Sequence, residues 1–269
     1  MIELMSRREI LELNKTFASF IINWQYQEYN PSLEHNKYKP GMMYDIRLNK
    51  LRRYSRKEVD SINKERLEVY NRVKDNVDII SIEEKYAGTL IYNFPYAEIE
   101  NYVETLSESM AAHAEESDWG SVIFLLVYPT PWLEQENDYG PVKNASDYLK
   151  SIGVTEDFSG GIKANGEDLE ELMKHLFWIV RCNASLPYCF FSGIDRDFVG
   201  NICQYGNVHF YFYSEHELIE TKNQAFILGM TAVEKCFENF SEPGVIRGRR
   251  LNFERRIKKP ITKPWWKFW

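Results

Sequence analysis

Two predicted strands near residue 205 carry residue types that could perform chemistry. Cys203 ends the segment 198–203, and His209 lies near the start of the segment 208–213. If these strands pair, the thiol and the imidazole come close together, as in enzymes whose cysteine nucleophile is activated by a histidine. Asp195 precedes the first strand and is the candidate carboxylate partner. Cys203, His209 and Asp195 are therefore the predicted catalytic residues of a hydrolase-like enzyme.

The alternation of side chains along the second strand favours a non-catalytic role for the same segment. Val208, Phe210 and Phe212 fall on one face of the second strand, whereas His209 and its tyrosine neighbours fall on the other. A face of histidine and tyrosine is typical of a hydrogen-bonded sheet surface. We therefore treat the hydrolase-like enzyme as an alternative to a function in binding.

A second group combines two glutamate and histidine pairs. Glu171 and His175 share one face of a predicted helix, and His216 and Glu220 share one face of another. Four such ligands would hold a divalent metal if the two faces met. A glutamate four residues from a histidine also stabilises a helix by itself, so we predict neither a metal nor another cofactor here.

The familiar catalytic and cofactor motifs are absent from the sequence. It contains no phosphate-binding loop, no dinucleotide-binding glycine pattern, no Gly-x-Ser-x-Gly elbow and no His-Glu-x-x-His helix. The glycine-rich turn at residues 159–161 precedes a helix whose first turns carry Glu167 and Asp168. Those carboxylates already complement the helix dipole, which disfavours a phosphate there.

Charge divides the chain into three blocks. Residues 1–74, 75–246 and 247–269 carry net charges of about +5, −20 and +8, which give the total of −7. An acidic body is suited to capture a basic protein, because complementary potentials speed association and select the partner. The same charge repels nucleic acid, which disfavours nucleic acid as a partner. We expect an inhibitor or immunity-type binding module. Its predicted contacts lie on two acidic loops: Glu134, Glu136, Asp138, Glu156 and Asp157.

The basic block forms an aromatic tail, in which Pro260 and Pro264 exclude one continuous helix. The tail has four alternative roles. It docks on the acidic body of its own chain or of a second copy in a homo-oligomer, it contacts a membrane surface, it acts as a nucleic-acid adaptor, or it serves as a partner-recognition peptide. The predicted contact residues are Arg249, Arg250, Arg255, Arg256, Trp265, Trp266 and Trp269.

Composition indicates a folded protein of a reducing compartment. The chain has 44% hydrophobic residues, enough for a core that needs no disulfide support. The four cysteines fit neither a Cys-x-x-Cys pair nor a dense disulfide framework, so we expect free and mostly buried thiols in a cytoplasmic protein. The first 15 residues include acidic side chains, unlike a signal peptide, and the longest apolar run, 122–128, is too short to span a bilayer.

Hydrophobic periodicity predicts an α+β fold in three parts. Residues 1–76 read as an N-terminal helical arm with helices at 5–29 and 55–76 and a loop at 30–43. Residues 77–246 read as an acidic α+β domain with a mixed sheet and helices packed on it. Residues 247–269 form the basic aromatic tail.

Within the acidic domain we expect residues 122–128 to be the centre of the sheet, because this apolar run suits a strand buried on both faces. The turn at residues 205–207 predicts a late antiparallel meander. Further strands are expected at 88–92, 186–192, 198–203 and 208–213, and helices at 96–116, 144–152, 165–180 and 215–240.

Overall fold

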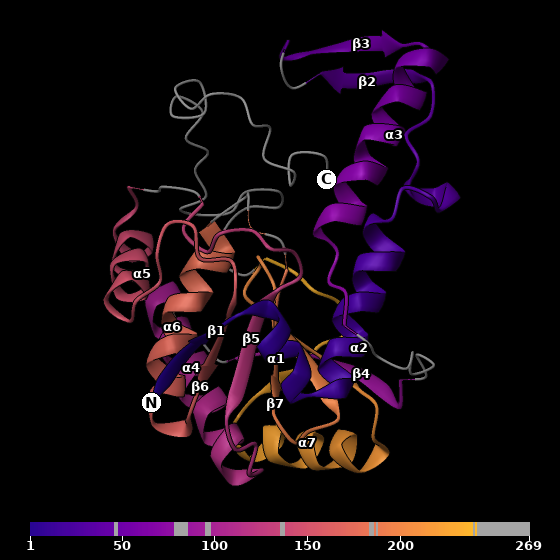
Figure 1. Cartoon of the computed structure of the whole chain (residues 1–269). Helices are drawn as coiled ribbons and strands as arrows, with labels where there is room; N and C mark the ends of the chain where they lie inside the picture. Colours follow the sequence, from indigo (N-terminus) through magenta and orange to yellow (C-terminus); the bar gives the residue numbers. More distant parts are fainter. Residues whose placement is uncertain are drawn as a thin grey trace.

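A computed structural model confirms the α+β class (Figure 1). The structure describes residues 1–45, 48–77, 86–94, 98–134, 138–182, 186, 188–238 and 240. The predictions for Glu136 and for the tail at residues 247–269 lie outside the described residues.

An eight-stranded sheet forms the centre of the molecule, in the order β1-β6-β5-β7-β8-β9-β4-β10. Each of the described strand pairs is antiparallel. The strands are β1 (Ile2–Met5), β4 (Gly88–Asn93), β5 (Val122–Leu126), β6 (Gly161–Ala164), β7 (Cys189–Gly193), β8 (Phe198–Ile202), β9 (Val208–Phe212) and β10 (Thr231–Ala232).

The predicted late antiparallel meander is confirmed as β7-β8-β9. The predicted mixed sheet differs from the structure, which pairs its described strands antiparallel throughout. The sequence shows that helices lie between strands, but it does not show the direction in which each following strand runs. Two strands are parallel only if the helix between them returns the chain to the end at which the first strand began. As expected, β5 is an interior strand, and all five of its residues are buried.

Residues Ile2–Met5 form an edge strand that the sequence analysis did not predict, since its first element is a helix that begins at residue 5. Ile2 pairs with Ala164 of β6, a strand that the sequence analysis also missed. Ser6 then begins α1 (Arg7–Leu13) with a capping box, in which its side chain and that of Glu9 each bond the other's backbone. Asn14 ends α1 and caps α2 (Lys15–Trp24), so two helices and the π-helix η1 (Gln25–Tyr29) replace the single predicted one.

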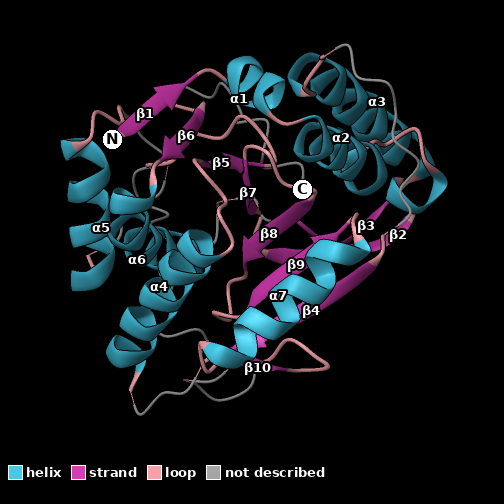
Figure 2. Ribbon diagram, turned by 90° about the horizontal axis from the view of Figure 1, so that it is seen from below, coloured by secondary structure: helices cyan, strands magenta, loops and turns pink. Residues whose placement is uncertain are grey.

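Helices cover both faces of the sheet (Figure 2). One face packs against helices from the later part of the chain, and the other packs against α1, α2 and the nearer part of α3 (Arg56–Val73). The later helices are α4 (Ile99–Glu116), α5 (Gly140–Ser151), α6 (Gly166–Cys182) and α7 (Glu215–Ile227).

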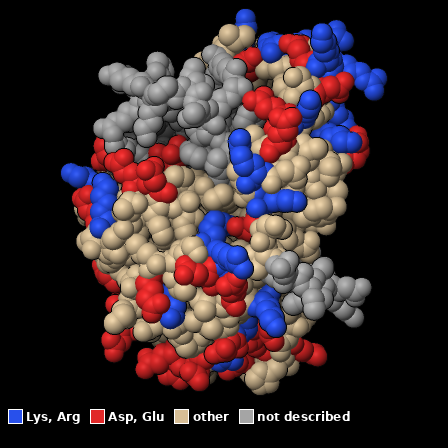
Figure 3. Space-filling view, in the orientation of Figure 1, with Lys and Arg blue, Asp and Glu red and all other residues tan. Residues whose placement is uncertain are grey.

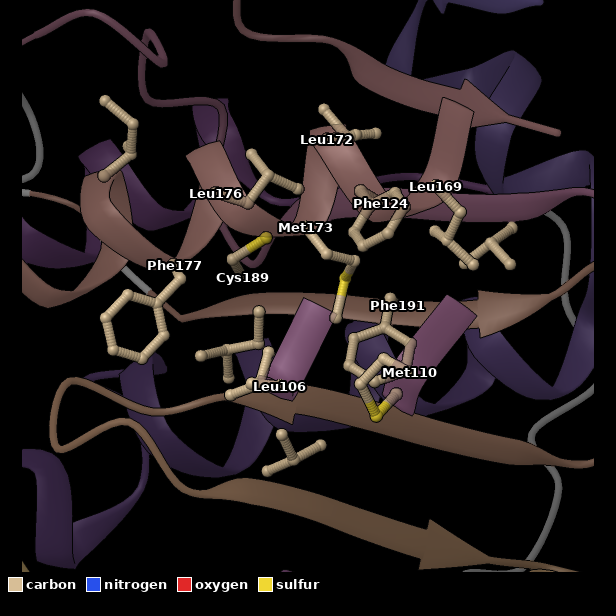
Figure 4. Close-up of a cluster of buried hydrophobic side chains, with 14 of the residues drawn as sticks. Leu106, Met110, Phe124, Leu169, Leu172, Met173, Leu176, Phe177, Cys189 and Phe191 are labelled. Carbon is tan, nitrogen blue, oxygen red and sulfur yellow. The ribbon is translucent and has the colours of Figure 1, made fainter. Parts of the chain in front are cut away.

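The larger core lies beneath α4 and α6 (Figure 4). The rings of Phe124 on β5 and Phe191 on β7 lie 5.8 Å apart between centroids and are tilted by 39°, and Leu106 and Met173 of the two helices belong to the same core. Gly200 of β8 is required here, since a Cβ atom would lie 2.3 Å from the Phe191 ring.

A buried polar network connects the N-terminal helices to the sheet. Arg7 forms a 2.6 Å ion pair with Asp75, and both side chains are nearly buried. Arg7 also donates to the carbonyl of Leu126, while Gln25 donates to Asp75 and to the carbonyl of Val127. Residues 1–77 therefore share a core with the sheet rather than contacting it at one point.

Helix α3 extends away from the body and carries a two-stranded sheet at its far end (Figure 1). The strands are β2 (Gly41–Asp45) and β3 (Lys50–Tyr54), which the sequence analysis did not predict. A short 3₁₀ helix, η2 (Glu34–Asn36), lies in the predicted loop. Arg52 binds Asp45 and Glu58 and so fixes the hairpin to the first turn of α3.

The last predicted helix, 215–240, is too long by more than a dozen residues. Helix α7 ends at Ile227, and Gly229 follows with a φ of +73°, a left-handed conformation that glycine adopts without strain. The chain then forms β10 against β4 and crosses the sheet toward the turn between β8 and β9.

Candidate functional site

The turn between β8 and β9 places Cys203 and His209 on the same face of the sheet. Asn201 lies opposite His209, and Cys203 is two residues beyond Asn201, so the two side chains leave on one side. The turn is closed by hydrogen bonds between Cys203 and Asn207 (2.9 Å) and between Gly206 and Cys203 (2.9 Å). The predicted proximity of the thiol and the imidazole is therefore present in the structure.

Cys236 is the third member of this cluster, and the sequence analysis missed it. Its Sγ lies 3.2 Å from Sγ of Cys203. One ring nitrogen of His209 lies within 4.8 Å of both sulfur atoms. We call Cys203, His209 and Cys236 the thiol–imidazole cluster. Cys236 is 33 residues from Cys203 in the sequence, and no spacing rule connects them.

Several contacts fix the position of Cys236. Val233 donates a backbone hydrogen bond to Ile91 of β4, and Asn207 donates from Nδ2 to the carbonyl of Phe237 at 2.8 Å. Glu238 forms a 2.8 Å ion pair with Arg181 at the end of α6, and their side chains are 6% and 0% exposed. The segment carrying Cys236 is thus held on both sides of the thiol.

Asn207 also bonds to the cluster itself. Its Nδ2 lies 3.3 Å from Sγ of Cys236 and 3.8 Å from Sγ of Cys203. Its Oδ1 accepts a hydrogen bond from Nδ2 of Asn93 at 2.9 Å, which sets the orientation of the amide. An oriented N–H group directed at two sulfur atoms stabilises negative charge on them.

The cluster favours one thiolate. The Cys236 thiol, acting as hydrogen-bond donor, and the neighbouring His209 lower the pKa of Cys203 to about 4, against the opposing effect of burial. The pKa of Cys236 is raised, because Cys236 would have to ionise beside the Cys203 sulfur. The buried Nε2 of His209 has no hydrogen-bond partner among the described residues.

Asp195 does not join the cluster. It is exposed in the turn between β7 and β8, which is the opposite end of β8 from Cys203. Asp197, the next acidic residue, accepts a hydrogen bond from Thr16 instead. The structure therefore brings together two of the three predicted catalytic residues and leaves the carboxylate apart.

The two predicted glutamate and histidine pairs do not meet in a metal site, and only the first pair makes a local helix contact. His175 lies 2.8 Å from Glu171 on α6 and stacks on Tyr148. Glu220 on α7 instead faces Arg196, at 3.6 Å. Among the described residues, the thiol–imidazole cluster is the one group of three or more that has the spacing of metal ligands.

The predicted acidic contacts come from two adjacent loops. Trp132 links these loops, since its backbone donates to the carbonyl of Phe158 at 3.1 Å and its indole donates to that of Gly160 at 2.9 Å. Glu134 is half-buried, whereas the other described members are exposed: Asp138, Glu156 and Asp157.

A larger acidic surface lies on α4 and α7, which pack beside each other (Figure 2). Arg196 joins them, donating to the carbonyl of Asp118 at the end of α4 and facing Glu220 of α7. Acidic side chains gather along the lower rim in Figure 3, where these helices lie in Figure 1. The exposed acidic residues of the two helices include Glu100, Glu104, Glu108, Glu115, Glu116 and Glu215.

Three large apolar side chains of α7 are exposed. Phe226 is 84% exposed, Ile227 is 71% exposed and Ile219 is 53% exposed. The buried stripe of the helix, at Thr221 and Ala225, already packs on the body, so these three residues face outward. We call this surface the α4–α7 face. It comprises Glu108, Glu115, Glu116, Glu215, Ile219, Phe226 and Ile227.

Comparison with family models, with curated proteins and with solved structures finds no match to this chain. Within the part of the chain that the structure describes, no helix has the length and apolar character needed to cross a membrane.

Proposed function

We propose that this chain is a protein-binding module that captures a basic partner through the α4–α7 face. The observation that carries the proposal is the exposure of Ile219, Phe226 and Ile227 on α7, a helix that contacts the acidic helix α4. Large apolar side chains that gather on a surface within a charged rim mark protein interaction sites.

The two components of the face have separate roles in this proposal. Burial of Phe226 and Ile227 against a partner supplies binding free energy, at roughly 25 cal/mol for each Å² of apolar surface removed from water. The carboxylates, such as Glu115 and Glu116, attract a basic surface and reject an acidic one. An inhibitor or immunity-type protein that neutralises a basic toxin or nuclease would use this combination.

The two acidic loops extend the same proposal. Glu134, Asp138, Glu156 and Asp157 come from loops that Trp132 holds side by side, and they provide additional contacts for a basic partner. The alternatives that involve the tail, which are self-association, membrane contact, nucleic-acid binding and partner recognition, remain predictions, since residues 247–269 lie outside the described part of the chain.

The test compares matched variants of the full-length protein as bait in nuclease-treated extract of its native cells. The expected result is one basic protein, recovered at fixed stoichiometry at low salt and released by high salt. Recovery should fall at least tenfold for Phe226→Ser/Ile227→Ser and for Glu115→Lys/Glu116→Lys.

Met42→Ser/Leu51→Ser is the control, because Met42 and Leu51 are exposed to a similar degree on the hairpin. The control should recover as much partner as the unmodified chain. Equal losses from the hairpin and the α4–α7 variants would contradict the assignment of this face. Recovery of the bait alone or as a homo-oligomer would contradict the function itself.

A further inference from the structure

The thiol–imidazole cluster has the composition of a site for a soft divalent metal ion. Two thiols and one imidazole are ligands that zinc prefers, and they come here from the end of β8, from β9 and from the segment after β10. Each ligand is placed by backbone contacts of its own element, so the three side chains meet without a shared local motif.

We infer that Cys203, His209 and Cys236 form a binding site for Zn²⁺ or a similar thiophilic divalent ion. This inference does not depend on the proposed capture of a basic partner, because it concerns different residues. The half-buried Cys236 and His209 lie at its outer side, and Cys203 lies at its buried side.

The separation of the sulfur atoms lies between that of a metal site and that of a disulfide, and it is closer to that of the metal site. Zinc bonds of about 2.3 Å to sulfur and about 2.0 Å to nitrogen, in tetrahedral geometry, place two sulfur ligands about 3.8 Å apart and a sulfur and a nitrogen about 3.5 Å apart. A disulfide needs about 2.05 Å between its sulfur atoms. The observed 3.2 Å is about 0.6 Å from the metal spacing and about 1.1 Å from the disulfide spacing.

The residues around the cluster also suit a metal. Asn207, oriented by Asn93, directs its N–H group at both sulfur atoms, the kind of outer hydrogen bond that positions a thiolate ligand. The buried Nε2 of His209 has no hydrogen-bond partner among the described residues.

Three protein ligands leave one position of a tetrahedral ion for water or for an external ligand. This arrangement is found in catalytic zinc sites, whereas structural sites use four protein ligands. The described residues supply no fourth cysteine, histidine or carboxylate within the 4.8 Å spacing of the cluster. We therefore assign the site an exchangeable fourth position.

The experiment titrates the reduced, metal-free, full-length protein with Zn²⁺ and, separately, with Co²⁺. We expect one equivalent of each ion to bind, and Co²⁺ to give the intense absorption of a tetrahedral centre with charge transfer from two thiolates. Added cyanide should shift the Co²⁺ bands by occupying the fourth position. Unchanged bands would contradict the exchangeable position.

Matched variants identify the ligands. Cys236→Ser and His209→Gln should each weaken Zn²⁺ binding by at least a hundredfold, and Asn207→Ala should weaken it by ten- to a hundredfold. Cys189→Ala is the control, since Cys189 is buried in the larger core and should leave the affinity unchanged. Far-ultraviolet circular dichroism of each variant without metal checks that it is folded.

Two results would overturn the inference. The first is a folded, reduced protein that binds no Zn²⁺ at one equivalent, or that binds it equally well after Cys236→Ser. The second is a bond between Cys203 and Cys236 that forms in air, detected as a mass lower by two hydrogen atoms, in a protein that still binds no metal after reduction. The second result would identify a dithiol instead.

Discussion

The α4–α7 face and the thiol–imidazole cluster are assembled in different ways. The face is built mainly from residues four, seven or eight positions apart on two helices, and its side chains remain in water. The cluster is built from three segments up to 33 residues apart, and its polar atoms are largely buried. Local periodicity can create the first kind of site, whereas the second kind requires the whole fold.

This difference has an energetic consequence. Removing the partner of a polar group in water changes stability little, because water replaces the partner. Removing the partner of a buried polar group destabilises the protein by the full desolvation free energy of that group. Changes around the cluster should therefore destabilise the protein strongly. Changes on the face should alter binding and leave folding nearly intact.

The largest effect is expected at the ion pair that holds the Cys236 segment. Arg181→Met leaves Glu238 buried without its partner, which should lower the free energy of unfolding by about 3–5 kcal/mol. Urea denaturation monitored by circular dichroism measures the change. The double variant Arg181→Met/Glu238→Gln should recover much of the loss. Failure to recover it would show that the stability comes from packing of the Arg181 side chain rather than from the pair.

The next largest effect is a loss of stability at low pH, and it comes from His113. This residue lies on the buried side of α4, opposite the exposed carboxylates. Burial, with a smaller contribution from Arg196, lowers the pKa of His113 to about 4. The pKa of this histidine in the unfolded chain is about 6.5. Between pH 6.5 and pH 4 the unfolded chain therefore binds a proton at this side chain whereas the folded chain does not, so the free energy of unfolding falls as the pH drops. His113 should therefore lower the free energy of unfolding by roughly 2–3 kcal/mol between pH 7 and pH 4.5.

This prediction is checked by measuring the denaturation midpoints of the unmodified chain and of two histidine variants at both pH values. His113→Leu should lose less stability on acidification than the unmodified chain does. His216→Gln, which changes an exposed histidine on α7, should lose as much as the unmodified chain does. Identical acid sensitivity of the two variants would mean that other groups cause the loss.

A smaller effect is expected at Asn207. Asn207→Ala removes donors to Cys236 and Phe237 and leaves the amide of Asn93 without its acceptor, so the loss should be about 1–3 kcal/mol. Thermal unfolding in the presence of a metal chelator measures this loss separately from any metal effect. A change below about 0.5 kcal/mol would indicate that water replaces the amide, and that the turn is more open than the hydrogen bonds suggest.

Sequence patterns predicted the parts of the molecule that depend on neighbouring residues. The apolar run around Phe124 indicated a fully buried strand, and the turn at Gly206 indicated the meander. The four-residue spacing of Glu100, Glu104 and Glu108 carries the same kind of signal for an acidic ridge, but the sequence analysis did not predict it. These features come from side-chain periodicity and turn chemistry, which act within a few residues.

The remaining features depend on contacts that no short window contains. The strand at Ile2 exists because it pairs with Ala164, a partner far away in the sequence. Cys236 joins Cys203 because α7 ends at Ile227, Gly229 turns the chain and β10 pairs with β4. Asp195 is the opposite case. It is close to Cys203 in the sequence, but strand β8 lies between the two residues and separates them in space by its length.

The most direct test of the binding function uses Phe226→Ser/Ile227→Ser and measures the urea midpoint and the recovery of the basic partner on the same preparation. We predict a free energy of unfolding within about 0.5 kcal/mol of the unmodified chain, as for other surface substitutions, together with at least a tenfold loss of partner. Unchanged recovery of the partner by this folded variant would contradict the assignment of the α4–α7 face as the binding surface.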